Sequence, residues 1–157
     1  MLNKITAAIK TYLPAEEVEA HCDGPCGVYD PASARIAAEA VLSMTKKILA
    51  LEVPAEGDAA GMVAYANTLS RYVQIKEEQA HLAKTELLVL WTDYFKPVHL
   101  DDYPDLHTTF WNAAKLCSAV KVGVDLDAAN NLMETCENIH DIFWATKNRD
   151  VEYYTAG

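Results

Sequence analysis

The chain has 157 residues and a formal net charge of −10. This length allows one domain with a hydrophobic core, and the acidic excess argues against nucleic acid or an anionic membrane as a partner, since their phosphates would repel it. No apolar run reaches the roughly 18 residues that a membrane-spanning helix needs, so we expect no membrane insertion.

The first 20 residues precede the main helical region. Apolar residues recur here near one helical face: Leu2, Ile5, Ile9 and Leu13. Pro14 ends this stretch, which lacks the unbroken apolar run of about 7–15 residues found in a secretory signal. We therefore expect a cytoplasmic, reducing compartment, in which the four cysteines are free or bound to metal.

Four helical stretches follow a loop that is rich in glycine and proline. They cover roughly residues 31–51, 58–95, 104–120 and 125–147. Asp30 before Pro31 and Asp125 are helix-start signals, and Pro97 ends the second stretch. No strand-type alternation is sustained, so the sequence predicts an all-α antiparallel four-helix bundle over about residues 30–148, with a frayed polar tail from Asn148.

The loop between residue 20 and the first long helix holds the closest group of potential metal ligands in the sequence. His21, Cys22 and Cys26 lie within six residues and offer one imidazole and two thiolates, which suit nickel, copper or zinc. Interspersed glycine and proline allow the backbone to turn until both sulfurs point at one centre. Besides a metal enzyme, two hypotheses stay open: a non-catalytic metal-binding or delivery module, and a thiol–disulfide protein that cycles Cys22–Cys26.

This loop resembles the hook of the nickel superoxide dismutase family, which reads H-C-x-x-P-C-G-x-Y. Residues 21–29 here read HCDGPCGVY. Further family landmarks follow in the same order: LWTDYFKP at 90–97, YP at 103–104 with LH at 106–107, and IFW at 142–144 with TK at 146–147. The resemblance implies a superoxide dismutase domain at residues 21–157 and assembly as a homohexamer.

The resemblance also implies how the hook binds one nickel ion per subunit. The ligands would be the α-amine and imidazole of His21, the amide nitrogen and thiolate of Cys22, and the thiolate of Cys26. Nickel would alternate between Ni(II) and Ni(III) and convert superoxide to oxygen and hydrogen peroxide. Since the His21 amine is locked in the bond to Ala20, we expect residues 1–20 to be a leader removed by a maturation protease. The alternative is an ordinary N-terminal helix that docks on the bundle.

Three further residues gain roles from the resemblance. Tyr29 and Tyr94 match family tyrosines near the open face of the nickel, where they would gate small anions and order water for proton delivery. Asp23 would fix the amides of the hook. For Tyr94 the alternative, an aromatic residue that packs in the core, stays open.

The residues that surround the hook in the family are partly replaced here. The family commonly holds the histidine imidazole with a glutamate and an arginine, whereas the matching positions carry Ala37 and Gln79. Three candidates remain for orienting His21, namely Gln79, Glu39 and His81.

Other side chains are expected to play smaller parts. Lysines at 96, 84 and 115 would supply a local positive field for superoxide. Histidines at 99, 107 and 140 are predicted in loops and at the surface, and Cys117 and Cys136 as small buried residues.

Overall fold

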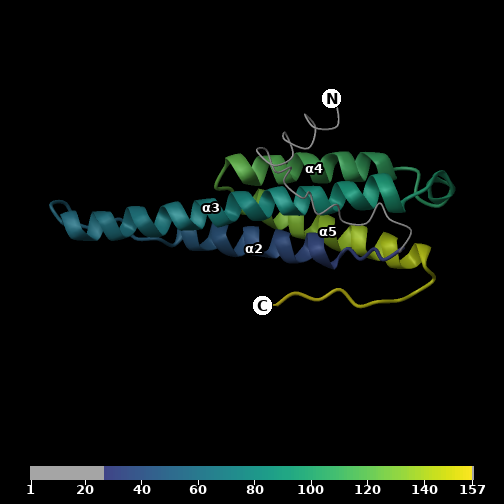
Figure 1. Cartoon of the computed structure of the whole chain (residues 1–157), viewed down its shortest axis with the longest axis horizontal. Helices are drawn as coiled ribbons and strands as arrows, with labels where there is room; N and C mark the ends of the chain where they lie inside the picture. The colour runs from purple at the N-terminus through teal and green to yellow at the C-terminus, as the bar shows by residue number, and fades with distance from the viewer. Residues whose placement is uncertain (1–26, 157) are drawn as a thin grey trace, which may run out of the picture.

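The computed structural model describes residues 27–156, in which four α-helices are present and no strand occurs. The helices are α2 (Ala32–Leu49), α3 (Ala59–Val89), α4 (Leu106–Val122) and α5 (Leu126–Thr146). Each helix packs on its neighbour in the chain, and α5 also packs on α2, which closes the bundle (Figure 1). The predicted four-helix bundle is confirmed.

Aspartate side chains fix where three of the helices begin. Before α2, Asp30 Oδ1 accepts a hydrogen bond from the Ala32 amide at 2.8 Å. Asp125 Oδ1 accepts one from the Ala128 amide at 3.0 Å at the start of α5, and Asp58 caps α3 in the same way. These bonds satisfy amides that have no partner inside the helix, so the start signals in the sequence are confirmed.

The core combines small residues with aromatic ones. Seven alanines are buried where helices approach closely, on α2, α3, α4 and α5. Aromatic side chains gather at the end of the bundle where α2 and α4 begin and α3 and α5 end: Phe95, Phe110, Phe143 and Trp144. The hook motif ends at Tyr29, shortly before α2 begins at this aromatic end. We therefore look for the surroundings of a metal site here.

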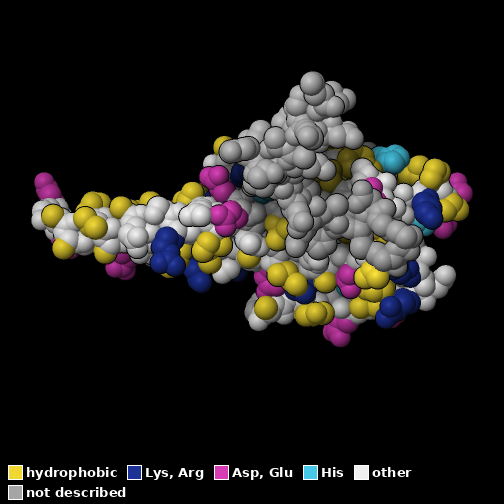
Figure 2. All heavy atoms as spheres, viewed as in Figure 1, with side chains coloured by type: hydrophobic (Ala, Val, Ile, Leu, Met, Phe, Trp, Pro, Cys, Tyr) yellow, Lys and Arg dark blue, Asp and Glu magenta, His cyan; other side chains and the backbone are white. Residues whose placement is uncertain are grey.

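Helix α3 is much longer than the helix that follows it. At 1.5 Å per residue its 31 residues span about 46 Å, against about 26 Å for the 17 residues of α4. The first part of α3 and the linker from α2 therefore project as an arm (Figure 1). Hydrophobic side chains cover much of this arm (Figure 2), and Val53, Met62 and Val63 are exposed on it.

The polar C-terminal tail is anchored, so the prediction that it frays from Asn148 is wrong. His140 Nε2 donates a hydrogen bond to the Val151 carbonyl oxygen at 2.7 Å, and the Ala156 amide donates to Glu39 Oε1 at 2.7 Å. The tail thus turns back along the bundle and contacts both α5 and α2 (Figure 1). Side chains of the tail add to these backbone anchors, since the Tyr153 hydroxyl donates to the Met133 carbonyl oxygen at 3.4 Å and the Tyr154 ring lies under Arg35 at 4.4 Å.

The three histidines after residue 90 lie in different surroundings. His99 is half-buried in a 3-10 turn, Pro97–Leu100, and His107 is exposed on α4. His140 is buried in α5, so its predicted surface position is wrong. Between residues 27 and 156, no helix combines the length and hydropathy needed to cross a membrane.

Candidate metal centre

The structure describes the exit of the hook but not its metal-binding residues. His21, Cys22, Asp23 and Cys26 lie outside the described residues. Gly27, the first described residue, has a φ of 64°, a left-handed conformation that favours glycine. Within residues 27–156 no group of three or more His, Cys, Asp or Glu side chains is placed to hold a metal.

Tyr29 and Tyr94, distant in the sequence, lie side by side. Their ring centroids are 5.6 Å apart. Tyr29 lies three residues before Ala32, the first residue of α2. Tyr94 ends a π-helical turn, Leu90–Tyr94, that continues from α3. The Phe95 amide donates to the Leu90 carbonyl at 3.1 Å, which is a bond to the fifth preceding residue. This turn interrupts the regular helix predicted up to Phe95 and changes the direction in which Tyr94 projects.

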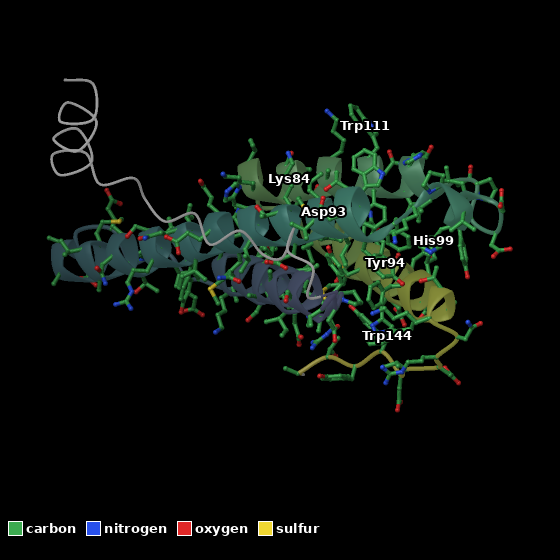
Figure 3. All side chains as sticks on the ribbon, turned by 45° about the vertical axis from the view of Figure 1, so that its right-hand side comes forward. Lys84, Asp93, Tyr94, His99, Trp111 and Trp144 are labelled. Carbon is green, nitrogen blue, oxygen red and sulfur yellow. The ribbon has the colours of Figure 1, made fainter. Side chains whose placement is uncertain are left out.

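Tyr94 is both a core residue and a neighbour of the hook. Its ring is half-buried and lies 4.5 Å from the Phe143 ring and 5.0 Å from the Phe95 ring, measured between centroids. The His99 ring stacks on it at 5.8 Å, and Figure 3 shows these two side chains together where α3 meets α5. Core packing, the alternative left open for Tyr94, is therefore present together with contact to Tyr29.

A lysine that the sequence analysis missed lies beside Tyr94. The ammonium nitrogen of Lys147 is 4.6 Å from the Phe143 ring centroid, 5.3 Å from that of Tyr94 and 5.6 Å from that of Trp144. These distances are typical of cation–π contacts. The spacing of Lys147 from Phe143, four residues along one helix face, is the sequence signal that could have indicated it.

The lysines that were predicted to attract superoxide lie in other surroundings. Lys84 Nζ donates to Ser118 Oγ at 3.2 Å, between α3 and α4. Lys115 Nζ lies 4.8 Å from the Trp111 ring centroid on α4, and Lys96 is exposed after the π-helical turn. None of these contacts includes Tyr29 or Tyr94, whereas Lys147 contacts Tyr94 directly.

A pocket of about 240 Å³ opens beside the exit of the hook. Its lining comes from the start of α2 and the last turns of α3: Val28, Tyr29, Asp30, Ser33, Glu86, Val89 and Leu90. The Glu86 side chain is 8% exposed. The pocket therefore places two acidic side chains next to the residues that lead into the hook.

The three candidates for orienting His21 differ in their surroundings. Glu39 Oε2 accepts from Arg35 Nη1 at 3.2 Å, and its other oxygen accepts from the Ala156 amide. Ala37 is buried and has no polar side-chain atom. Gln79 is half-buried and His81 is exposed. Because His21 lies outside the described residues, Gln79, Glu39 and His81 all remain candidates for orienting it.

Cys117 and Cys136 are buried, free thiols, as predicted. Burial raises the pKa of the Cys117 thiol to about 11. Burial, reinforced by the neighbouring Cys117, raises the pKa of Cys136 to about 12. Both side chains therefore stay protonated at neutral pH and act as small apolar residues.

Comparisons with known proteins identify the family of this chain. The family described as nickel-containing superoxide dismutase matches residues 16–147. Superoxide dismutase [Ni] from Streptomyces seoulensis is 42% identical over 138 residues, which cover 88% of this chain and 96% of that protein. The protein of the same name from Streptomyces coelicolor is 39% identical over the same shares.

Solved structures give the same result for the fold. A native nickel superoxide dismutase structure has a TM-score of 0.69 and 40% identity, and the similarity covers 81% of this chain and 99% of that one. A nickel-containing superoxide dismutase after partial X-ray-induced reduction has a TM-score of 0.67 and 43% identity, over 82% and 100%. This chain therefore belongs to the nickel-containing superoxide dismutase family.

Proposed function

We propose that this chain is the precursor of a nickel-dependent superoxide dismutase that is activated by cleavage before His21. The observation that carries the proposal is the family match over residues 16–147, which includes the whole donor set of the hook. The substrate is superoxide, and the products are oxygen and hydrogen peroxide.

The chemistry of the donor set fits nickel. Cys22 and Cys26 supply two thiolates, and His21 supplies an imidazole and, once its amine is free, a second nitrogen. The amide nitrogen of Cys22 would be a further nitrogen ligand, and a set of thiolate and nitrogen donors suits nickel. When bound, nickel would supply the Ni(II)/Ni(III) couple that exchanges single electrons with superoxide.

The need for a free amine explains the leader. While Ala20 is attached, the His21 nitrogen is an amide and cannot be an amine ligand. Cleavage gives an α-amine with a reference pKa of about 7.7–8.0, which a metal can bind in its deprotonated form. Residues 1–20 are then a propeptide for a maturation protease, and residues 21–157 form the enzyme. N-terminal sequencing of the active protein tests this, and a fully active chain that begins at Met1 would refute it.

The side chains around the exit of the hook would handle water and the anionic substrate. Tyr29 and Tyr94 present two phenols at the end of the bundle where the hook joins it. They would gate the approach of small anions and order water near the metal, while Asp23 would hold the amides of the hook. Lys147 adds a positive charge beside Tyr94 in a chain whose net charge is −10.

The homohexamer and the cytoplasmic location are part of the same proposal. The exposed apolar residues of the arm, among them Val53 and Val63, offer surface that assembly would bury. Light scattering of the trimmed, nickel-loaded protein measures the mass. A monomeric protein with full activity would contradict the hexamer.

One experiment separates the enzyme from its two rivals. The trimmed chain is loaded with nickel, zinc or copper, and superoxide decay is followed before and after chelation. We expect activity only with nickel, lost on chelation and restored by nickel. Equal binding of zinc or copper without superoxide decay would favour the metal-delivery module. A thiol–disulfide activity that survives chelation would favour the Cys22–Cys26 redox protein.

A further inference from the structure

The hydroxyl of Thr146, the last residue of α5, has two partners. Its Oγ1 lies 2.6 Å from the Tyr94 hydroxyl oxygen and 2.7 Å from the Phe143 carbonyl oxygen. Thr146 is half-buried, and it joins the end of α5 to the π-helical turn that carries Tyr94. The hydrogen bonds of Tyr94 are therefore set by a residue far from it in the sequence.

The two contacts together fix the direction of the bond to Tyr94. A carbonyl oxygen can only accept, so the single proton of the Thr146 hydroxyl goes to Phe143. The Thr146 oxygen must then accept the proton of Tyr94. Tyr94 thus donates its hydroxyl proton to Thr146. For any other partner the Tyr94 oxygen can only accept a hydrogen bond.

Packing keeps the phenol in this position. The rings of Phe143, Phe95 and Tyr29 lie around it at centroid distances of 4.5, 5.0 and 5.6 Å. The stacked His99 ring is itself held, because the Lys96 amide donates to His99 Nδ1 at 3.1 Å. A change of direction at the Tyr94 hydroxyl thus requires a change at Thr146 rather than a swing of the ring.

We propose that Thr146 is a positioning residue that makes Tyr94 a hydrogen-bond acceptor toward the hook. This inference rests on the proposed function. Dismutation of two superoxide ions to oxygen and hydrogen peroxide takes up two protons. With Tyr94 accepting, a water bound to the phenol oxygen would have to point one of its hydrogens at it, and both protons would come from solvent. The phenol keeps its own proton throughout.

The first test measures the hydrogen bond without nickel. Ultraviolet resonance Raman spectra of the metal-free full chain report whether a tyrosine hydroxyl donates, and subtraction of the Tyr94→Phe spectrum isolates Tyr94. We expect a donor signature in the wild type and in Thr146→Ser, and its loss in Thr146→Val. Thr135→Val is the matched control: Thr135 Oγ1 donates to the Asn131 carbonyl on the same helix at 2.7 Å, a bond that does not involve tyrosine.

The second test measures superoxide decay by the trimmed, nickel-loaded variants. We expect Thr146→Val to lower the rate constant about 2- to 10-fold, the factor that one neutral hydrogen bond is worth, and to change the solvent isotope effect. Thr146→Ser should restore both, and Thr135→Val should change neither. Thr146→Ala replaces Thr146→Val if the latter does not fold.

The outcomes separate this inference from the proposed function. A donor signature that persists in Thr146→Val would overturn the assignment, and so would its loss with an unchanged rate constant and isotope effect. A wild-type protein that carries the donor signature and binds nickel but leaves superoxide untouched would overturn the proposed function, and the role of Thr146 with it.

Discussion

A buried lysine gives the sharpest test of how the bundle is held together. Lys76 on α3 is 1% exposed, and its ammonium donates to the carbonyl oxygens of Val120, of Lys121 at 2.9 Å and of Gly123 at 2.7 Å. Carbonyls in the last turn of a helix have no partner within it, and a cation there also faces the negative end of the helix dipole. Lys76 therefore caps the C-terminal end of α4.

The substitution Lys76→Met removes the charge and keeps most of the apolar stem. Hydrogen bonds from a charged group contribute about 1.5–3 kcal/mol each. Burial of the ammonium offsets part of their sum, and the same burial lowers the pKa of Lys76 against the opposing effect of Glu77. We expect a net loss of about 2–4 kcal/mol in the free energy of unfolding, because three carbonyls lose their donor.

Urea unfolding followed by circular dichroism measures this loss at one fixed protein concentration. Lys84→Met is the matched control, since Lys84 lies on the same helix and makes one 3.2 Å bond to Ser118 Oγ. We expect the control to lose less than about 1 kcal/mol. Equal losses in the two variants would refute the capping role of Lys76.

Three further predictions concern thiols and charge. In the native metal-free chain, Ellman's reagent should modify two of the four cysteines, and all four after denaturation, since Cys117 and Cys136 are buried. Stability should fall as the pH rises above about 9. A thiol in the unfolded chain has a pKa of about 8.5, whereas burial raises the pKa of Cys117 to about 11 and that of Cys136 to about 12 in the folded chain. Between these values the two thiols lose their protons only in the unfolded state, which favours unfolding. Urea midpoints across this range check the slope, which Cys136→Ala should reduce. Lys147→Met should slow superoxide decay several-fold at low ionic strength and less at high salt, whereas Arg149→Met, whose cation lies over Trp144, should change it little. An effect of Lys147→Met that does not depend on salt would contradict electrostatic attraction.

The helices could be predicted because their signals are local. Asp30 and Asp125 act on amides within three residues of themselves, and they begin helices in the structure as predicted. Asp58 caps α3 in the same way, although the sequence analysis did not name it as a cap. The apolar repeats of α4 and α5 likewise indicated which faces pack inward, including the positions of Cys117 and Cys136. The family landmarks identified Tyr94 in the same way, by short ordered motifs.

The contacts at the aromatic end could not be predicted because they depend on how separate helices align. The bond between Tyr94 and Thr146 needs the π-helical turn, and one extra residue per turn leaves no clear mark in an apolar repeat. The position of Lys147 over the Tyr94 ring likewise depends on how the end of α5 lies against the π-helical turn. The tail's path was not predicted because it turns back along the bundle, where Ala156 meets Glu39 of α2, 117 residues away in the sequence.

The central claim is that this chain becomes a nickel superoxide dismutase when His21 is its first residue. The most direct measurement compares a chain cut to start at His21 with the chain from Met1, both loaded with nickel. Superoxide decay and the rhombic Ni(III) electron-spin signal are recorded for each. We expect both from the trimmed chain and neither from the full-length chain. Absence of both from the trimmed chain, or full activity of the chain from Met1, would contradict it.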